Sequence, residues 1–175
     1  MASSADSERL VVVDHGHAIA FSFTDVMSYH GPSSPGGVSH AFKVLQRGLP
    51  LLEPDGAPER REIAVRTAFA GPGARDAFEC VLRAVTEDRY VVDASLERPD
   101  LGPTRARFVF RLTYRERVAT LTLRDGFVTR EFLELAGQDE RAPEAEARLT
   151  LLKRQMAERV MSASAADVYD ATGER

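Results

Sequence analysis

Two different spacings of apolar residues alternate along this chain, and that alternation limits the folds it can adopt. Residues 63–69 alternate apolar and polar side chains, which is the period of a β-strand with one covered face. Residues 74–85 instead carry apolar side chains three and four positions apart, which form one stripe along an α-helix. In chain order the expected elements run β, α, β, α, β, β, α, α. Because two strands follow each other without an intervening helix, we predict an α+β fold, with antiparallel strands packed by amphipathic helices, rather than a doubly wound sheet.

The same patterns give approximate bounds for each element. Strands are expected at residues 10–13, 17–23, 63–69, 90–93, 107–113 and 118–124. Helices are expected as one turn capped by Thr24, at residues 38–52, at 74–85, at 130–136 between a Thr129 cap and Gly137, and at 143–161. Residues 162–175 show no regular pattern. We therefore expect an α+β domain at residues 9–137 and a C-terminal helical extension with a tail at residues 138–175.

Composition narrows the classes of protein and partner. At 43% hydrophobic and 29% charged residues, the chain can bury a core and is not globally disordered. Its net charge of −4 argues against nucleic acid or an anionic membrane surface as a partner. The first thirty residues lack a basic segment followed by a long apolar run, so a cytoplasmic protein is expected.

All four histidines, which are the commonest metal ligands in proteins, lie within the first forty residues. His15 and His17 are separated by one residue, so on an extended strand their side chains point the same way. Together with His30 they are candidate ligands for a divalent transition metal such as zinc or iron. The alternative interpretation is an ordinary surface turn beside a polar strand.

A dense run of helix-breaking residues at positions 31–37 precedes the second expected helix. The unpaired N–H groups at a helix N-terminus bind anions, and serine hydroxyls add donors. Gly31, Ser33, Ser34 and Gly36 are therefore candidate ligand-binding residues, for a small or anionic molecule. The alternative is a tight turn that needs glycine only for its backbone angles.

Other chemical signatures are absent from the sequence. It contains no HExxH or paired CxxC metal motif, no Walker A loop, no GxSxG nucleophile elbow and no GxGxxG fingerprint. Its single cysteine, Cys80, excludes an intrachain disulfide and lies beside an apolar helix stripe, which favours a packed, inert thiol.

One stretch resembles a known family. The segment SFTDVMSYHG at residues 22–31, followed by Ser-Pro-Gly at 34–36 and an amphipathic helix, is similar to the start of the FmdE-like domain, a family associated with formylmethanofuran dehydrogenase. Residues 63–79, with Asp76-Ala77, resemble the second landmark of that family, and residues 108–112 resemble its next strand. Together these landmarks cover residues 21–123. The resemblance implies a pocket lined by His30, Ser33, Ser34 and the turn at residues 71–76.

The motif departs from the family at its metal-binding positions. His30 and Gly31 are retained, but Pro32 replaces a second histidine and Ser34 replaces a cysteine. A serine hydroxyl is a poor ligand for zinc or iron beside a thiolate. We therefore expect the metal site of the family to be lost or rebuilt in this chain.

Three functions follow as hypotheses from these residues. The first is an accessory protein, expected to be a homodimer, that binds a small ligand or a metal at the loop from His30 to Ser34. The second is an enzyme that uses His30 as general base or metal ligand, with Asp76, or His15 and His17, in support. The third is a non-catalytic domain kept for dimerisation or partner binding. Asp76 also has a purely structural interpretation, since a carboxylate in the first turn of a helix is stabilised by the dipole.

Overall fold

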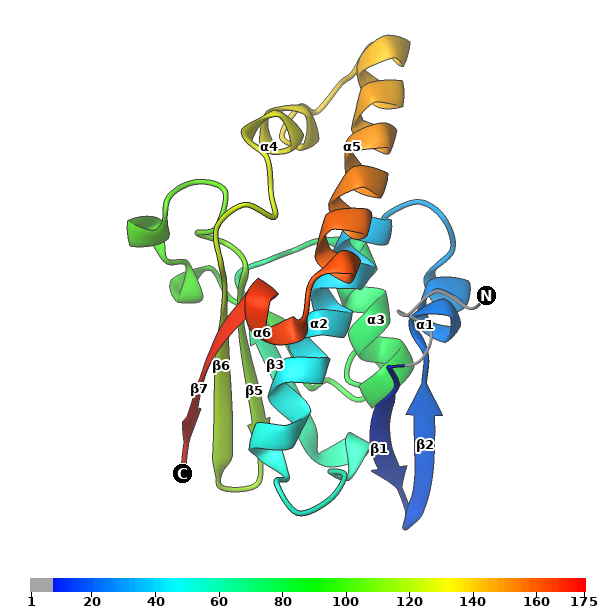
Figure 1. Ribbon diagram of the computed structural model, residues 1–175, viewed down its shortest axis with the longest axis vertical. Coiled ribbons are helices and arrows are strands. Elements are labelled where there is room, and N and C mark those ends of the chain that lie inside the picture. Colours follow the sequence, from blue (N-terminus) through cyan, green and yellow to red (C-terminus); the bar gives the residue numbers. More distant parts are fainter. Residues whose placement is uncertain (1–7) are drawn as a thin grey trace.

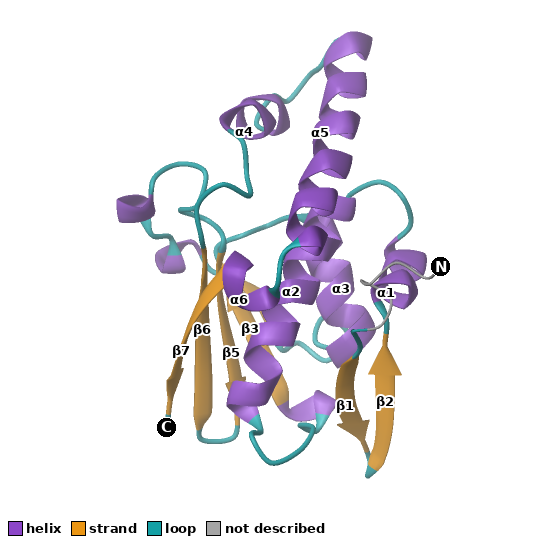
Figure 2. Cartoon of the chain, in the orientation of Figure 1, coloured by secondary structure: helices purple, strands orange, loops and turns teal. Residues whose placement is uncertain are grey.

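The computed structural model describes residues 8–175 and contains two separate β-sheets with helices packed between and around them (Figures 1 and 2). The strands are β1 Leu10–Asp14, β2 His17–Phe21, β3 Ile63–Thr67, β4 Tyr90–Val92, β5 Val109–Tyr114, β6 Arg117–Leu123 and β7 Tyr169–Glu174. The helices are α1 Phe23–His30, α2 Pro35–Leu52, α3 Pro72–Leu82, α4 Arg130–Ala136, α5 Pro143–Ser162 and α6 Ala165–Val168. This arrangement confirms the predicted α+β class.

The larger sheet has five strands in the order β4-β3-β5-β6-β7. Its pairs are antiparallel except β3 with β4, which are parallel and connected through α3. In β3 the residues Ile63, Val65 and Thr67 are buried while those between them are more exposed, as the alternating sequence pattern predicts. The apolar residues of these strands therefore form one face that the helices cover.

Helix α2 occupies the centre of the molecule and contacts both sheets as well as α1, α3, α5 and α6. Twelve of its eighteen residues are buried. At Gly48 an added Cβ would lie 2.6 Å from Leu112 Cδ1, so this glycine allows the helix to approach β5 closely. The core of the protein is consequently built around one helix rather than under one sheet.

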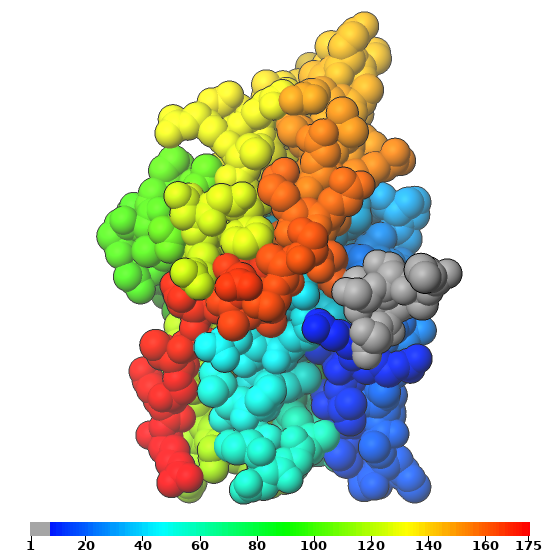
Figure 3. Space-filling view, in the orientation of Figure 1, coloured from blue at the N-terminus to red at the C-terminus, as the bar shows by residue number. Residues whose placement is uncertain are grey.

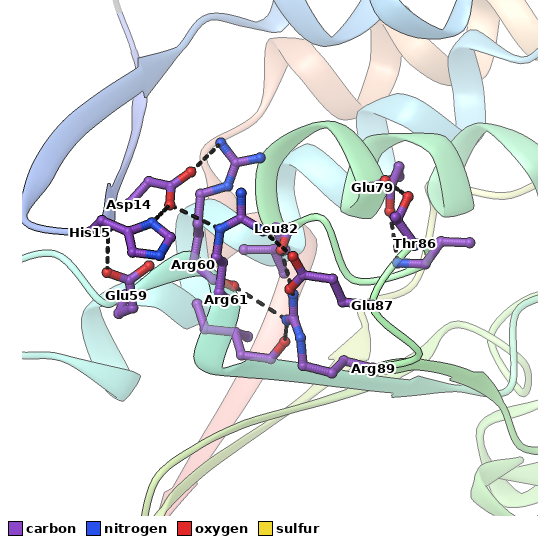
Figure 4. Close-up of polar contacts among 12 residues, drawn as sticks. Asp14, His15, Glu59, Arg60, Arg61, Glu79, Leu82, Thr86, Glu87 and Arg89 are labelled. Atoms are coloured by element: carbon purple, nitrogen blue, oxygen red, sulfur yellow. Dashed lines mark hydrogen bonds and ion pairs between the residues drawn. The ribbon is translucent and has the colours of Figure 1, made fainter.

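The smaller sheet is a hairpin of β1 and β2, which lies beyond α2 and α3 at the right of Figure 1. Its two-residue turn places His15 at φ 50° and Gly16 at φ 83°, as a type I′ turn requires. Leu10 and Val12 face the core and are buried. An ion-pair network fixes the turn to the rest of the fold, because Arg61 pairs with both Asp14 and Glu87 (Figure 4).

Several helix bounds differ from those expected. Helix α1 runs for eight residues, and its cap is Ser22 rather than Thr24, since Ser22 Oγ accepts from Asp25 N–H while Asp25 Oδ2 accepts from Ser22 N–H. Helix α2 begins at Pro35 rather than at residue 38, because proline suits the first helical position. The last three residues of the expected loop at 31–37 are therefore helical. Helix α3 spans Pro72–Leu82 and stops before Val85 at Arg83, whose φ of 58° ends the helix.

The expectation of an irregular tail after residue 162 is wrong. That stretch forms α6 and the edge strand β7, which pairs along the whole of its length with β6. Its sequence, YDATGE, carries little apolar alternation, so only the long-range pairing reveals the strand. Across residues 8–175, no helix is both long enough and apolar enough to span a membrane.

Candidate functional site

His30 is the last residue of α1, and its ring is held between two helices. Gly31 ends α1 at a φ of 84°, and its N–H donates to Met27 O over 2.7 Å. The His30 side chain is only 4% exposed. Its Nδ1 lies 2.7 Å from Oδ2 of Asp76, on helix α3, which packs against α1. The packing of two helices thus brings together residues 46 positions apart.

Ser33 completes a chain of three polar side chains, since its Oγ lies 3.3 Å from His30 Nε2. An ionised carboxylate only accepts hydrogen bonds, so the contact with Asp76 places the ring proton on Nδ1. Nε2 then carries a lone pair directed at the Ser33 hydroxyl. The order carboxylate, imidazole, hydroxyl is the one that activates a serine nucleophile.

Two cationic side chains flank this group. Lys153 Nζ, on α5, donates to the backbone oxygen of Ser33 over 3.3 Å. Arg75 Nη1 lies 3.5 Å from the second carboxylate oxygen of Asp76. Ser33 is an exposed residue, so the group opens to solvent beside Lys153.

The remaining residues of the loop have packing roles. Ser34 is the N-cap of α2 and is buried, and an added Cβ at Gly73 would lie 2.3 Å from Ser34 O. Gly36 is covered by α5, where an added Cβ would lie 2.9 Å from Met156 Sδ. The N-terminal ends of α2 and α3 therefore meet through small residues, which fixes Asp76 relative to Ser33.

Of the residues expected to bind a ligand, the structure brings Ser33 and Asp76 to His30. Gly31 shapes the bend between them. Gly31 and Pro32 also line a surface hollow of about 350 Å³ together with Phe23 and Met27 of α1. Ser34 and Gly36 are instead enclosed by neighbouring elements.

His15 and His17 lie at the turn end of the hairpin and do not join His30. His15 Nδ1 contacts Asp14 Oδ1 at 2.6 Å, and its backbone N–H donates to Glu59 Oε2 over 2.9 Å (Figure 4). Within residues 8–175 no group of three or more His, Cys, Asp or Glu side chains is placed to hold a metal ion. Among these described residues the acidic contact of His30 is Asp76 alone, and both ring nitrogens are engaged, so this donor set does not fit a three-ligand site.

The fourth histidine, His40, lies inside the core. Its Nδ1 is 2.8 Å from the hydroxyl oxygen of Tyr169, and its ring packs on Phe108 with centroids 4.7 Å apart. Burial, reinforced by the nearby charge of Arg159, lowers the pKa of His40 from 6.5 to about 3. His40 is therefore a neutral core residue.

Cys80 is partly buried on α3. Desolvation raises the pKa of its thiol to about 11, which keeps it protonated and unreactive near neutral pH. The structure agrees with the packed, inert thiol expected from the sequence.

Sequence patterns account for only one of the two side chains that contact Ser33. His30 and Ser33 are three positions apart in the sequence, so their contact is local. Lys153 is 120 residues from Ser33, and no local pattern connects the two.

No protein-family model matches this sequence, and a search of curated proteins gives no significant match. The resemblance to the FmdE-like domain thus stays a prediction.

Proposed function

We propose that this chain is an enzyme of the acyl-transfer class, in which Ser33 is the nucleophile, His30 the general base and Asp76 the residue that orients His30. The observation that supports the proposal is the continuous contact from Asp76 Oδ2 to His30 Nδ1 at 2.7 Å and from His30 Nε2 to Ser33 Oγ at 3.3 Å. The site has the two hydrogen-bond contacts that a serine nucleophile needs. A carboxylic ester or thioester is the substrate class that such a group attacks most readily.

The reaction would proceed in two steps, acylation of Ser33 and hydrolysis of the acyl-enzyme. As Ser33 Oγ bonds to the acyl carbon, its proton passes to His30 Nε2, and Asp76 stabilises the imidazolium that results. The same proton then leaves with the alcohol or thiol, which breaks the acyl bond and leaves Ser33 acylated. Water, deprotonated by His30, then bonds to the acyl carbon; the bond from that carbon to Ser33 Oγ breaks, and His30 returns the proton to Oγ, which releases the acid and restores the serine. Lys153, beside Ser33, supplies positive charge for the oxyanion that forms in each step.

Ligand binding without catalysis is the second candidate, and the cations support it. Lys153 donates to the backbone oxygen of the exposed Ser33, and Arg75 lies beside Asp76; cations near an exposed serine hydroxyl suit a carboxylate or phosphate. This is the binding role expected from the sequence, with Ser33 rather than Ser34 facing the ligand.

A relation to the FmdE-like domain is a separate proposal about ancestry. It is supported by the α+β architecture and by the contact between the two segments that resemble the landmarks of that family, at His30 and at Asp76. On this hypothesis a serine nucleophile has replaced the metal chemistry of the family.

A fluorophosphonate probe tests the proposed nucleophile without knowledge of the substrate. We expect mass spectrometry to find the label on Ser33, and we expect labelling to fall about 10²–10⁴-fold in His30→Gln, because the general base is lost. Asp76→Asn should reduce labelling as well. Ser28→Ala is the matched control, since Ser28 is an exposed serine on the neighbouring helix α1.

The outcome separates the candidates. Labelling that is insensitive to His30→Gln, or equal on Ser28 and Ser33, would refute the activated nucleophile. In that case, protection of Ser33 amide exchange by inorganic phosphate, lost in Lys153→Gln, would support the binding role.

A further inference from the structure

Within residues 8–175 the two sheets present four edges, and one of them, β2, lacks the usual protection against pairing with another chain. Strand β4 has only three residues, and β7 carries Asp170 and Glu174. The outer edge of β1 is occupied by a bridge to Glu59. Short length, charge and coverage are the devices that prevent sheet edges from associating. Strand β2, His17–Phe21 with the sequence HAIAF, has no acidic residue, no lysine, no arginine and no proline.

Hydrogen-bonded and non-hydrogen-bonded residue pairs alternate along the hairpin, and this alternation shows which backbone groups of β2 do not bond to β1. A two-residue turn is closed by a hydrogen bond between its flanking residues, here Asp14 and His17. Pairs alternate along an antiparallel ladder, so Ile19 and Phe21 also bond to β1, whereas Ala18 and Ala20 point their N–H and C=O groups outward. Val13, opposite Ala18, confirms this alternation because its N–H donates away from β2, to Pro58 O over 2.9 Å.

These free groups match a second copy of themselves. If two β2 strands pair antiparallel about a two-fold axis at Ile19, Ala18 of each copy lies opposite Ala20 of the other. Both residues then have outward N–H and C=O groups, and the two copies exchange four hydrogen bonds. Ala18 and Ala20 are exposed, and no backbone bond to another element involves them within residues 8–175.

The side chains at this edge also suit close approach. The outer face of the hairpin consists of Val11, Val13, Ala18 and Ala20, and it carries no charge. Val11 is 43% exposed although it is a large apolar residue. The hairpin lies at the side of the molecule in Figure 3, where its surface (blue, lower right) is not enclosed by the five-stranded sheet. Joining two hairpins would turn two marginal two-stranded sheets into one four-stranded sheet.

We infer that the chain forms a two-fold homodimer by antiparallel pairing of β2 with β2 of a second copy, centred on Ile19. The interface does not include Ser33, His30 or Asp76, so the test of the dimer does not depend on the proposed reaction.

Analytical ultracentrifugation of three proteins tests the inference. The wild type is expected to sediment as a dimer, at twice the chain mass of 19.3 kDa. Ala20→Pro removes two symmetry-related N–H donors that point away from β1, and should weaken dimerisation about thirtyfold. Val11→Pro is the matched control, because its N–H points toward the opposite edge of the same hairpin, and it should leave the dimer unchanged.

A cross-link keeps the test decisive if Ala20→Pro fails to fold. In a Cys80→Ala background, Ile19→Cys places two thiols directly opposite at the two-fold axis, where Cα atoms are about 4.5 Å apart and a disulfide can form. We expect a covalent dimer on oxidation, and none from Val92→Cys on the exposed strand β4. A monomeric wild type, an Ala20→Pro dimer with the same dissociation constant as the wild type, an Ile19→Cys protein that does not cross-link or a Val92→Cys protein that does would overturn the inference.

Discussion

Acid should destabilise this protein through one buried histidine. His40, on α2, is fully buried against Phe108 and Tyr169. Its pKa falls from the usual 6.5 to about 3, because the charged ring would lose its hydration. The folded state therefore holds His40 neutral, whereas the unfolded chain protonates it below about pH 6.5. The unfolded state binds the extra proton, so stability falls as the pH drops from 6.5 toward 3.

The size of the effect follows from the two pKa values. The pKa of His40 is 6.5 in the unfolded chain and about 3 in the folded protein. At 1.36 kcal/mol for each pH unit, lowering the pH across this whole range would reduce the free energy of unfolding by about 5 kcal/mol. Between pH 7.5 and pH 4.5 only the part below 6.5 contributes, and His40 alone should lower the free energy of unfolding by about 2.6 kcal/mol. Since domains of this size are stable by only about 5–15 kcal/mol, that loss is a large fraction of the total.

The comparison of wild type with His40→Gln isolates this contribution. Glutamine keeps a polar partner for the Tyr169 hydroxyl but does not titrate. Urea unfolding followed by circular dichroism at pH 7.5 and 4.5 gives four free energies, and the other titrating groups cancel in their double difference. We expect the wild type to lose about 2.6 kcal/mol more than His40→Gln over this range. A double difference below about 0.5 kcal/mol would show that His40 is hydrated or charged in the folded protein, contrary to its burial.

Two packing predictions concern helix α3. Phe78 is fully buried beside Tyr90 and Phe110, so Phe78→Ala should cost about 3–5 kcal/mol in urea unfolding, whereas Val92→Ala, at an exposed position, should stay within about 0.5 kcal/mol. Gly73→Ala places a Cβ 2.3 Å from the backbone oxygen at the start of α2 and should cost about 1–3 kcal/mol by the same assay. Gly56→Ala, which meets no atom within 4 Å, is its control, and equal stability of the two variants would contradict the close approach of α2 and α3.

Elements with local signals were predictable from the sequence. Helix α4 has the expected bounds, because Thr129 caps it through the N–H of Phe132 and Gly137 follows its last residue. Strand β7 was not predictable, since its polar residues become a strand only by pairing with β6, about fifty positions earlier. A polar edge strand has no apolar period, and the information that specifies it lies in its neighbour.

The site shows the same division between local and long-range information. The contact between His30 and Ser33 lies within one short segment of the chain, whereas the contact with Asp76 depends on how α1 packs on α3. Sequence proximity was misleading for the histidines, because His40 is separated from His30 by the start of α2 and lies in the core. Helix α2 is enclosed by several elements at once, so its polar residues His40 and Lys43 are buried along with its apolar ones.

The contrast between α2 and α4 implies an uneven distribution of local unfolding. Helix α4, which the structure describes in full, has no buried residue and is held mainly by α5, including the ion pair between Glu131 and Arg148. It can therefore open while the rest of the molecule stays folded, and its amide protons should exchange with solvent through small fluctuations. Helix α2 packs against strands of both sheets, so unfolding it would expose the core on both sides. Its amides can therefore exchange only when the whole protein unfolds. The slowest-exchanging amides of α2 thus report the global stability of the molecule.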